Sequence, residues 1–371
     1  MRRLATAVVV ATLVVALSGC LRTPHLTVTT VVTGLDHVWD IGFTPDGTML
    51  FTERPGRISA LVGGQKRLLA APADVVQASE AGMMGLAIDP QFASNRLIYV
   101  CMASTLGGPN NDVRVVRFRV ATNYTVLTER RDIVTGAPVN TTGELGRHSG
   151  CRPRFGPDGA LWIGTGDSAS ATVPQDVHSL GGKILRVTTT GAPAPGNPGG
   201  TWDPRIWSIG HRNTQGLAWR SSDGLGVSTE HGPDRDDEVN RLDSGQFGWD
   251  PLRPPSTAYD ESVPMTDLQR FPNAHRAIVA SGYPTIAPCG ATFLSGTRWG
   301  EWNGALVVAL LKGEALRAFK LEASSGRLLD MGGALDDRGR LRSVTQGPDG
   351  NLYVGTDNGG GNDRILRLTP G

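Results

Sequence analysis

A short turn motif, Pro-Asp-Gly followed by an apolar run and a second polar turn, recurs along the chain. It has three clear copies, GFTPDGTMLFTERPGRI (42–58), RFGPDGALWIGTGDS (154–168) and TQGPDGNLYVGTDN (345–358). Proline fixes φ and glycine accepts positive φ, so each Pro-Asp-Gly predicts a tight turn between two strands. Self-similarity of this kind predicts several copies of one supersecondary unit arranged side by side.

Three weaker copies raise the number of units to six: IDPQFASNRLIYVCMA (88–103), WRSSDGLGVSTEHG (219–232) and SGTRWGEWNGALVVALLKG (295–313). One turn residue marks each copy, in chain order Asp46, Asp89, Asp158, Asp223, Asn303 and Asp349. Six hairpin units predict an all-β, six-bladed β-propeller of four-stranded antiparallel blades. The alternative is a β-sandwich whose hairpins resemble one another by coincidence.

Two stretches interrupt the repeats, the Gly/Pro-rich segment 188–204 and the long polar segment 251–277. We interpret both as loops over a face of the propeller, because no second core follows them.

The N-terminal sequence predicts that the chain is exported. Two arginines precede an apolar run that ends in Leu-Ser-Gly-Cys, which is typical of a secretory signal peptide and resembles a bacterial lipobox. We therefore expect a signal peptide at 1–19, an acylated Cys20 that begins a tether (20–26), and a single propeller domain at 27–371. The apolar run is shorter than the roughly 20 residues of a membrane span. The expected location is the cell envelope, on the outer face of the cytoplasmic membrane, held by the lipid anchor only.

Charge and cysteine content exclude some classes of site. The chain has 36 basic and 35 acidic residues, so it lacks the basic excess of a nucleic-acid-binding protein. Besides Cys20, it has Cys101, Cys151 and Cys289. Three cysteines allow one intramolecular disulfide and leave one thiol, and no Cys/His spacing suggests zinc.

Seven segments, in order and spacing, resemble one known family: GMMGLAIDPQFASNRLIYV, GRHSGCRPRFGPDGALWIGTGD, LGGKILRV, GHRNTQGLAW, TEHGPDRDDEVN, YPTIAPCGA and RLRSVTQGPDGNLYVGTD. They look like the soluble glucose/sorbosone (aldose sugar) dehydrogenases, six-bladed propellers that use pyrroloquinoline quinone (PQQ) and Ca²⁺. The resemblance covers roughly 30 to 370. It implies a quinoprotein oxidoreductase that oxidises a small sugar to its lactone and passes electrons to an acceptor that the sequence does not name.

His148 is the expected general base. An imidazole changes charge near neutral pH and so accepts a proton under ordinary conditions. The resemblance implies that His148 takes the proton of the sugar C1 hydroxyl while hydride passes to the quinone. It also implies that Asp167 orients His148 and that Arg212 assists the reaction.

PQQ carries three carboxylates and an ortho-quinone, so its site needs several cations and hydrogen-bond donors. The residues at matching positions are Glu80, Arg212, Asn213, Lys312, Arg340 and Arg342. Glu80 departs from the family, which has glutamine there. A carboxylate facing an anionic cofactor is unfavourable unless it is paired or protonated.

The turn EHGPDRDDEVN (230–240) offers oxygen ligands of the kind that Ca²⁺ prefers. The resemblance assigns the metal to the carbonyls of Gly232 and Pro233. Cys151 and Cys289 fall in motifs that line the expected channel, and we hypothesise a Cys151–Cys289 disulfide across its mouth.

Two other functions compete with the dehydrogenase. Glu80 and the cysteines motivate a non-catalytic propeller lipoprotein that has lost PQQ and binds a ligand or an envelope partner. A Ca²⁺-dependent lactonase is the third, and the convergence of arginine and lysine fits it less well.

Overall fold

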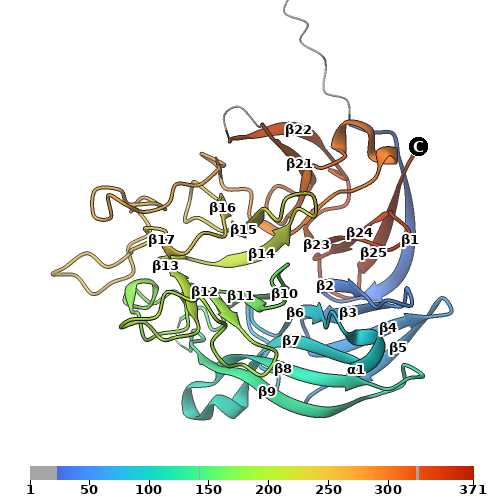
Figure 1. Cartoon of the computed structure of the whole chain (residues 1–371), viewed down its shortest axis with the longest axis horizontal. Coiled ribbons are helices and arrows are strands. Elements are labelled where there is room, and N and C mark those ends of the chain that lie inside the picture. The colour runs from blue at the N-terminus through green and yellow to red at the C-terminus, as the bar shows by residue number, and fades with distance from the viewer. Residues whose placement is uncertain (1–22, 142, 323–325) are drawn as a thin grey trace, which may run out of the picture.

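The computed structural model describes residues 23–141, 143–322 and 326–371, and these form six small sheets arranged in a ring (Figure 1), antiparallel except for one short parallel pair in the third sheet. The six-bladed propeller that the repeats predict is confirmed. The predicted signal peptide and Cys20 lie outside the described residues, and the first described strand begins at Leu26.

We number the blades in chain order. Blade 1 contains β2 (Val38–Phe43), β3 (Met49–Glu53), β4 (Arg57–Val62) and β5 (Gln65–Ala70). Blade 2 contains β6 (Met83–Ile88), β7 (Leu97–Ser104), β8 (Asp112–Val120) and β9 (Leu127–Ala137). Blade 3 contains β10 (Gly150–Phe155), β11 (Leu161–Thr165), β12 (Lys183–Val187) and β13 (Ile206–Ile209), and it is extended by β17 (Gly245–Gln246).

Blade 4 contains β14 (Thr214–Trp219), β15 (Gly226–Glu230), β16 (Glu238–Arg241) and the short β18 (Val279–Ala280). Blade 5 contains β19 (Pro288–Phe293), β20 (Leu306–Leu310), β21 (Leu316–Leu321) and β22 (Leu328–Ala334). Blade 6 contains β23 (Leu341–Gln346), β24 (Leu352–Thr356) and β25 (Asp363–Pro370), and its fourth strand is β1 (Leu26–Leu35).

The first strand of each blade lies innermost. β2, β6, β10, β14, β19 and β23 each contact the first strands of both neighbouring blades, and β23 contacts β2 to complete the circle. The second strands are covered on both faces, and two of them, β7 (LIYVCMAS) and β20 (LVVAL), are almost continuously apolar. In β3, β11, β20 and β24 every residue is buried.

The two ends of the chain close the ring. β1 pairs antiparallel with β25, from Leu26 opposite Pro370 to Leu35 opposite Asp363, and the two strands lie side by side at the edge of the ring (Figure 1).

Antiparallel strands alternate in direction, so the turns of each blade fall alternately on two faces of the ring. The six marker residues, Asp46, Asp89, Asp158, Asp223, Asn303 and Asp349, all lie in turns between a first and a second strand. They therefore share one face, which we call the marker face. The turns between second and third strands, and the connections from one blade to the next, lie on the other face, which we call the site face.

The hypothesis of a Cys151–Cys289 disulfide is wrong. Cys151 on β10 bonds Cys101 on β7, with a Cα–Cα distance of 6.1 Å. β10 packs against the first two strands of blade 2, so Cys101 is a close neighbour. Cys289 lies two blades further on, in β19, and it is a buried free thiol.

In the part of the chain that the structure describes, the helices are α1 (Phe92–Asn95) and short 3₁₀ segments at Thr105–Asn110, Val173–Gln175 and Thr297–Trp302. Within the described ranges, no helix has the length and apolar content needed to span a bilayer.

Candidate active site

The predicted catalytic and cofactor residues gather on the site face. Glu80, His148, Arg212, Asn213 and Arg340 lie in connections that lead into the first strands of blades 2, 3, 4 and 6. Because these strands line the centre of the ring, the side chains of the preceding residues reach its mouth. Asp167 and Lys312 follow the second strands of blades 3 and 5, on the same face.

His148 and Asp167 form a buried pair. The Nδ1 atom of His148 lies 2.9 Å from Asp167 Oδ1, and the two residues are 3% and 0% exposed. A carboxylate only accepts hydrogen bonds, so Nδ1 carries the proton and Nε2 carries the lone pair. No described residue forms a hydrogen bond with Nε2, which leaves it free to act as a base.

Two aromatic residues that the sequence reading did not single out hold Asp167 from the other side. Trp249 Nε1 donates to Asp167 Oδ2 at 2.8 Å, and Tyr259 Oη donates to the same oxygen at 2.6 Å. Burial and the charge of Asp167 raise the pKa of Tyr259 well above its usual value, so its hydroxyl keeps its proton. Tyr259 belongs to the polar loop 251–277, which therefore covers His148.

Arg212 is buried beneath the same loop. Its guanidinium donates to the carbonyls of His231 at 3.1 Å and Gly232 at 2.7 Å, and it pairs with Glu261 at 3.0 Å. Its Nε is buried and has no hydrogen-bond partner. The neighbouring His211 has both ring nitrogens bonded, to Ser208 and Glu230, and is fully buried.

Glu80 is paired, and its partner is the residue predicted to hold the quinone. Its Oε2 accepts from Asn213 Nδ2 at 2.8 Å and from Gln215 Nε2 at 3.0 Å. Burial alone would raise the pKa of Glu80, but the nearby His148 and His231 and the bond from Asn213 hold it below the ordinary value. The carboxylate is therefore ionised. It accepts a hydrogen bond from the side-chain NH₂ group of Asn213, which was predicted to bind the quinone.

Arg342 on β23 is fixed by Asp357, which follows β24. The Nη2 and Nε atoms of Arg342 lie 3.0 Å from Asp357 Oδ2 and Oδ1, and His37 Nδ1 lies 2.9 Å from the same Oδ1. Burial opposes the ionised form of Asp357, but Arg342 and His37 lower its pKa. Arg340 is more exposed and approaches Asp357 only to 3.7 Å.

Lys312 lies at the edge of this group. It is exposed, and its Nζ donates to the hydroxyl of Thr285 at 2.8 Å.

The predicted calcium turn is held by hydrogen bonds within the protein. The Asp237 carboxylate accepts backbone N–H bonds from Gly232, Ile286 and Ala287 at 2.5–2.8 Å. The Gly232 carbonyl accepts from Arg212, so of the two predicted ligands only the Pro233 carbonyl has no protein donor among the described residues. The carbonyls of Gly232 and Pro233 stay predicted ligands, and the first of them already accepts one bond within the protein.

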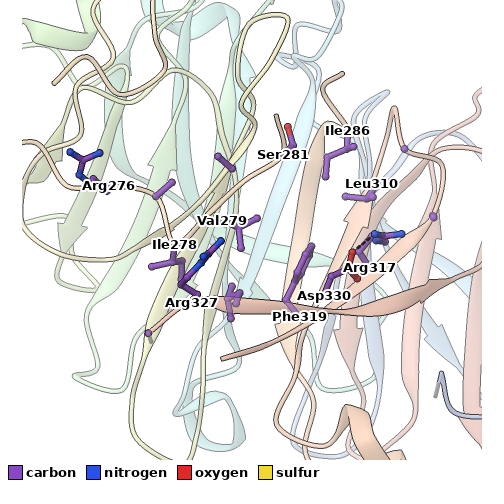
Figure 2. Close-up of a pocket in the computed structure, with 16 residues that line it drawn as sticks. Arg276, Ile278, Val279, Ser281, Ile286, Leu310, Arg317, Phe319, Arg327 and Asp330 are labelled. Carbon is purple, nitrogen blue, oxygen red and sulfur yellow. Dashed lines mark hydrogen bonds and ion pairs between the residues drawn. The ribbon is translucent and has the colours of Figure 1, made fainter. Parts of the chain in front are cut away.

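The structure also has a cleft of about 970 Å³ away from this group, between the outer strands of blades 4 and 5 (Figure 2). Its lining comes from the segment that contains β18 on one side and from β21, β22 and the turns beside them on the other. Apolar side chains such as Phe319 line it beside the Arg317–Asp330 ion pair. None of the predicted site residues lines this cleft.

Comparison with known proteins agrees with this arrangement. The family model "Glucose / Sorbosone dehydrogenase" matches residues 35–367. The chain is 29% identical to the aldose sugar dehydrogenase YliI of Escherichia coli K12, with 91% of each chain covered. It is 25% identical to quinoprotein glucose dehydrogenase B of Acinetobacter calcoaceticus, over 85% of this chain and 82% of that protein.

Solved structures agree as well. A putative oxidoreductase (glucose dehydrogenase) of Thermus thermophilus is 38% identical, with a TM-score of 0.78 over 93% of this chain and all of that one. The PQQ-bound aldose sugar dehydrogenase of Streptomyces coelicolor is 30% identical, with a TM-score of 0.75 over 93% and 99%. The chain belongs to the glucose/sorbosone dehydrogenase family of PQQ-dependent oxidoreductases.

Proposed function

We propose that this protein oxidises an aldose-type sugar to its lactone with PQQ as the electron acceptor in the site. The observation that carries the proposal is the free Nε2 of His148. Its opposite nitrogen is fixed by a fully buried carboxylate, and several cations lie on the same face of the ring.

The site has donor groups that suit an anionic ligand. The buried Nε atoms of Arg212 and Arg54 lack hydrogen-bond partners, and such donors are costly unless a ligand completes them. Arg340 and Lys312 add positive charge on the same face. PQQ, with three carboxylates, suits this donor set, and Arg212, Arg340, Arg342 and Lys312 would hold it.

The residues of the chain divide the remaining work. His148 accepts the proton of the C1 hydroxyl at Nε2, and the charge of Asp167 stabilises the imidazolium that results. Trp249 and Tyr259 keep Asp167 in place, and loop 251–277 covers the site and limits its access to water. PQQ, when bound, accepts the hydride of C1.

Ca²⁺ remains part of the proposal as a metal that binds together with PQQ. Because Arg212 occupies the Gly232 carbonyl, Ca²⁺ alone is expected to stabilise the protein little. Thermal unfolding with Ca²⁺, with PQQ and with both checks this. A strong stabilisation by Ca²⁺ alone would show that the turn is a complete site.

The proposal is tested by adding PQQ and Ca²⁺ to the purified protein and measuring dye reduction with a panel of sugars. His148→Gln should abolish turnover and leave PQQ binding in place. His178→Gln, an exposed histidine of the same blade, is the matched control and should stay active. If the wild type neither binds PQQ nor turns over any aldose, the proposal fails.

The competing function is a propeller that no longer binds PQQ. The contact between Glu80 and Asn213 favours it, because it occupies a donor that the cofactor was expected to use. A dissociation constant for PQQ tighter than about 1 µM would exclude it.

We also propose that Cys20 is acylated and holds the protein at the outer face of the cytoplasmic membrane. The LSGC sequence after an apolar run supports this. Cys20→Ser should move the protein from the membrane fraction to the soluble fraction, and an unchanged membrane fraction would refute the anchor.

A further inference from the structure

We propose that Arg54 is an additional anion-binding residue of this site and takes a carboxylate of PQQ. The proposal rests on the function proposed above and adds a residue that the sequence reading did not include.

The backbone of Arg54 is fixed on the site face. It follows β3 in the turn to β4, where its N–H donates to the His37 carbonyl at 3.0 Å and its carbonyl accepts from Met83 N at 2.9 Å. The side chain passes closely over Gly82. A Cβ atom at Gly82 would lie 2.3 Å from the Arg54 carbonyl oxygen and 2.7 Å from its Cγ. Glycine at 82, two residues after Glu80, therefore leaves room for the Arg54 side chain. The charges that act on its guanidinium include those of Arg342 and Asp357.

Among the described residues, the guanidinium of Arg54 has no hydrogen-bond or ion-pair partner. Its Nε is buried and makes no hydrogen bond. Among the described residues, no carboxylate lies within ion-pair distance of it. Asp357, a buried acid whose charge acts on Arg54, is already shared by Arg342 at 3.0 Å and His37 at 2.9 Å, with Arg340 at 3.7 Å.

The cluster therefore has an excess of positive charge. Three guanidiniums, those of Arg54, Arg340 and Arg342, lie near two carboxylates, those of Asp357 and the partly exposed Asp36. Burial and repulsion from Arg342 lower the pKa of Arg54, and the charges of Asp357 and Asp36 compensate this effect only in part. A planar guanidinium matches a carboxylate through two parallel hydrogen bonds. A carboxylate-bearing ligand would supply the missing charge and acceptors.

The test compares Arg54→Gln with the wild type in two measurements. The first is thermal unfolding of the protein without cofactor, and the second is the PQQ dissociation constant from a fluorescence titration. Arg67→Gln is the matched control, because Arg67 is an exposed arginine of the same blade that donates only to the Asn123 carbonyl.

We expect Arg54→Gln to weaken PQQ binding about 10- to 100-fold, the loss typical of one charge-assisted interaction. Its midpoint of unfolding without cofactor should equal or exceed that of the wild type, because a repelled charge is removed. Arg54→Lys should bind with intermediate affinity, and Arg67→Gln should match the wild type.

Two results would overturn the assignment. If the wild type binds PQQ and Arg54→Gln binds it within twofold, Arg54 does not contact the cofactor, while the proposed function stands. If Arg54→Gln unfolds at a clearly lower temperature without cofactor, the guanidinium is a structural partner instead. A wild type that fails to bind PQQ would refute the proposed function as well.

Discussion

Asp167→Asn changes one atom of the side chain and tests the reasoning about His148 directly. Each oxygen of Asp167 accepts two donors: Oδ1 from His148 and the Ala169 N–H, and Oδ2 from Trp249 and Tyr259. An amide has only one acceptor oxygen, so its NH₂ group must face one of these pairs.

Both orientations of the amide are unfavourable. If the NH₂ group faces Trp249, the indole N–H loses its acceptor, while the Tyr259 hydroxyl rotates to accept. If it faces His148, the Ala169 N–H loses its acceptor and the imidazole must accept at Nδ1. The proton then moves to Nε2, where the base is needed. A buried donor without a partner costs about 1–3 kcal/mol, and the bonds to a charged acceptor are also weakened, so we expect a loss of about 2–4 kcal/mol of unfolding free energy.

The test needs two measurements, the free energy of unfolding and kcat. Urea unfolding without cofactor gives the free-energy change, and dye reduction with PQQ gives kcat, which should fall about 10²- to 10⁴-fold because correctly placed general-base catalysis is lost. Asp158→Asn is the matched control. It also accepts a tryptophan N–H and a backbone N–H, at 3.1 and 3.2 Å, but on the marker face. It should lose some stability and keep its kcat.

The reasoning fails if Asp167→Asn keeps the kcat of the wild type. It also fails if Asp158→Asn loses as much activity, because the effect would then report general destabilisation of blade 3 and not the state of His148.

Three further predictions concern single groups. Tyr259→Phe should lower kcat about tenfold with a smaller change in KM, since one hydrogen bond to charged Asp167 is lost; steady-state kinetics decide, and an unchanged kcat contradicts it. Burial and Glu230 raise the pKa of Glu238 to about 8, so the folded protein holds a proton that the unfolded chain has released. Stability should therefore fall between about pH 5 and pH 8, by up to about 1.4 kcal/mol per pH unit. Glu238→Gln should flatten this slope in urea unfolding, and an equal slope would refute it. Burial raises the pKa of the Cys289 thiol to about 12, so protein lacking the N-terminal 20 residues should show no reactive thiol when native. It should show one when denatured and three after reduction of the Cys101–Cys151 disulfide, and a reactive native thiol would contradict the burial.

The repeats were sufficient to predict the architecture, for a physical reason. Each marker turn ties a first strand to a second strand, so six markers require six blades, and alternation of strand direction places the predicted site residues on one face. Local sequence encodes both properties.

Contacts between distant segments were not encoded in this way. The partner of Cys151 depends on how β10 packs against blade 2, and the spacing of the cysteines contains no such information. Tyr259 lies in a loop without periodicity, so nothing in the sequence indicated that it reaches Asp167. Glu80 was recognised as unusual, but its amide partners, Asn213 and Gln215, became visible only when blades 2 and 4 were placed around one centre.

The pairing of β1 with β25 has a consequence for synthesis. A chain made from its N-terminus displays the ten residues of β1 long before their partner exists. At about 5–20 residues per second, that strand waits roughly 20–70 s as an unpaired edge, the kind of segment that aggregates or recruits a chaperone. A circular permutant that begins at β2 and joins β25 directly to β1 would make blade 6 a local hairpin array. It should therefore close its ring faster than the natural chain does.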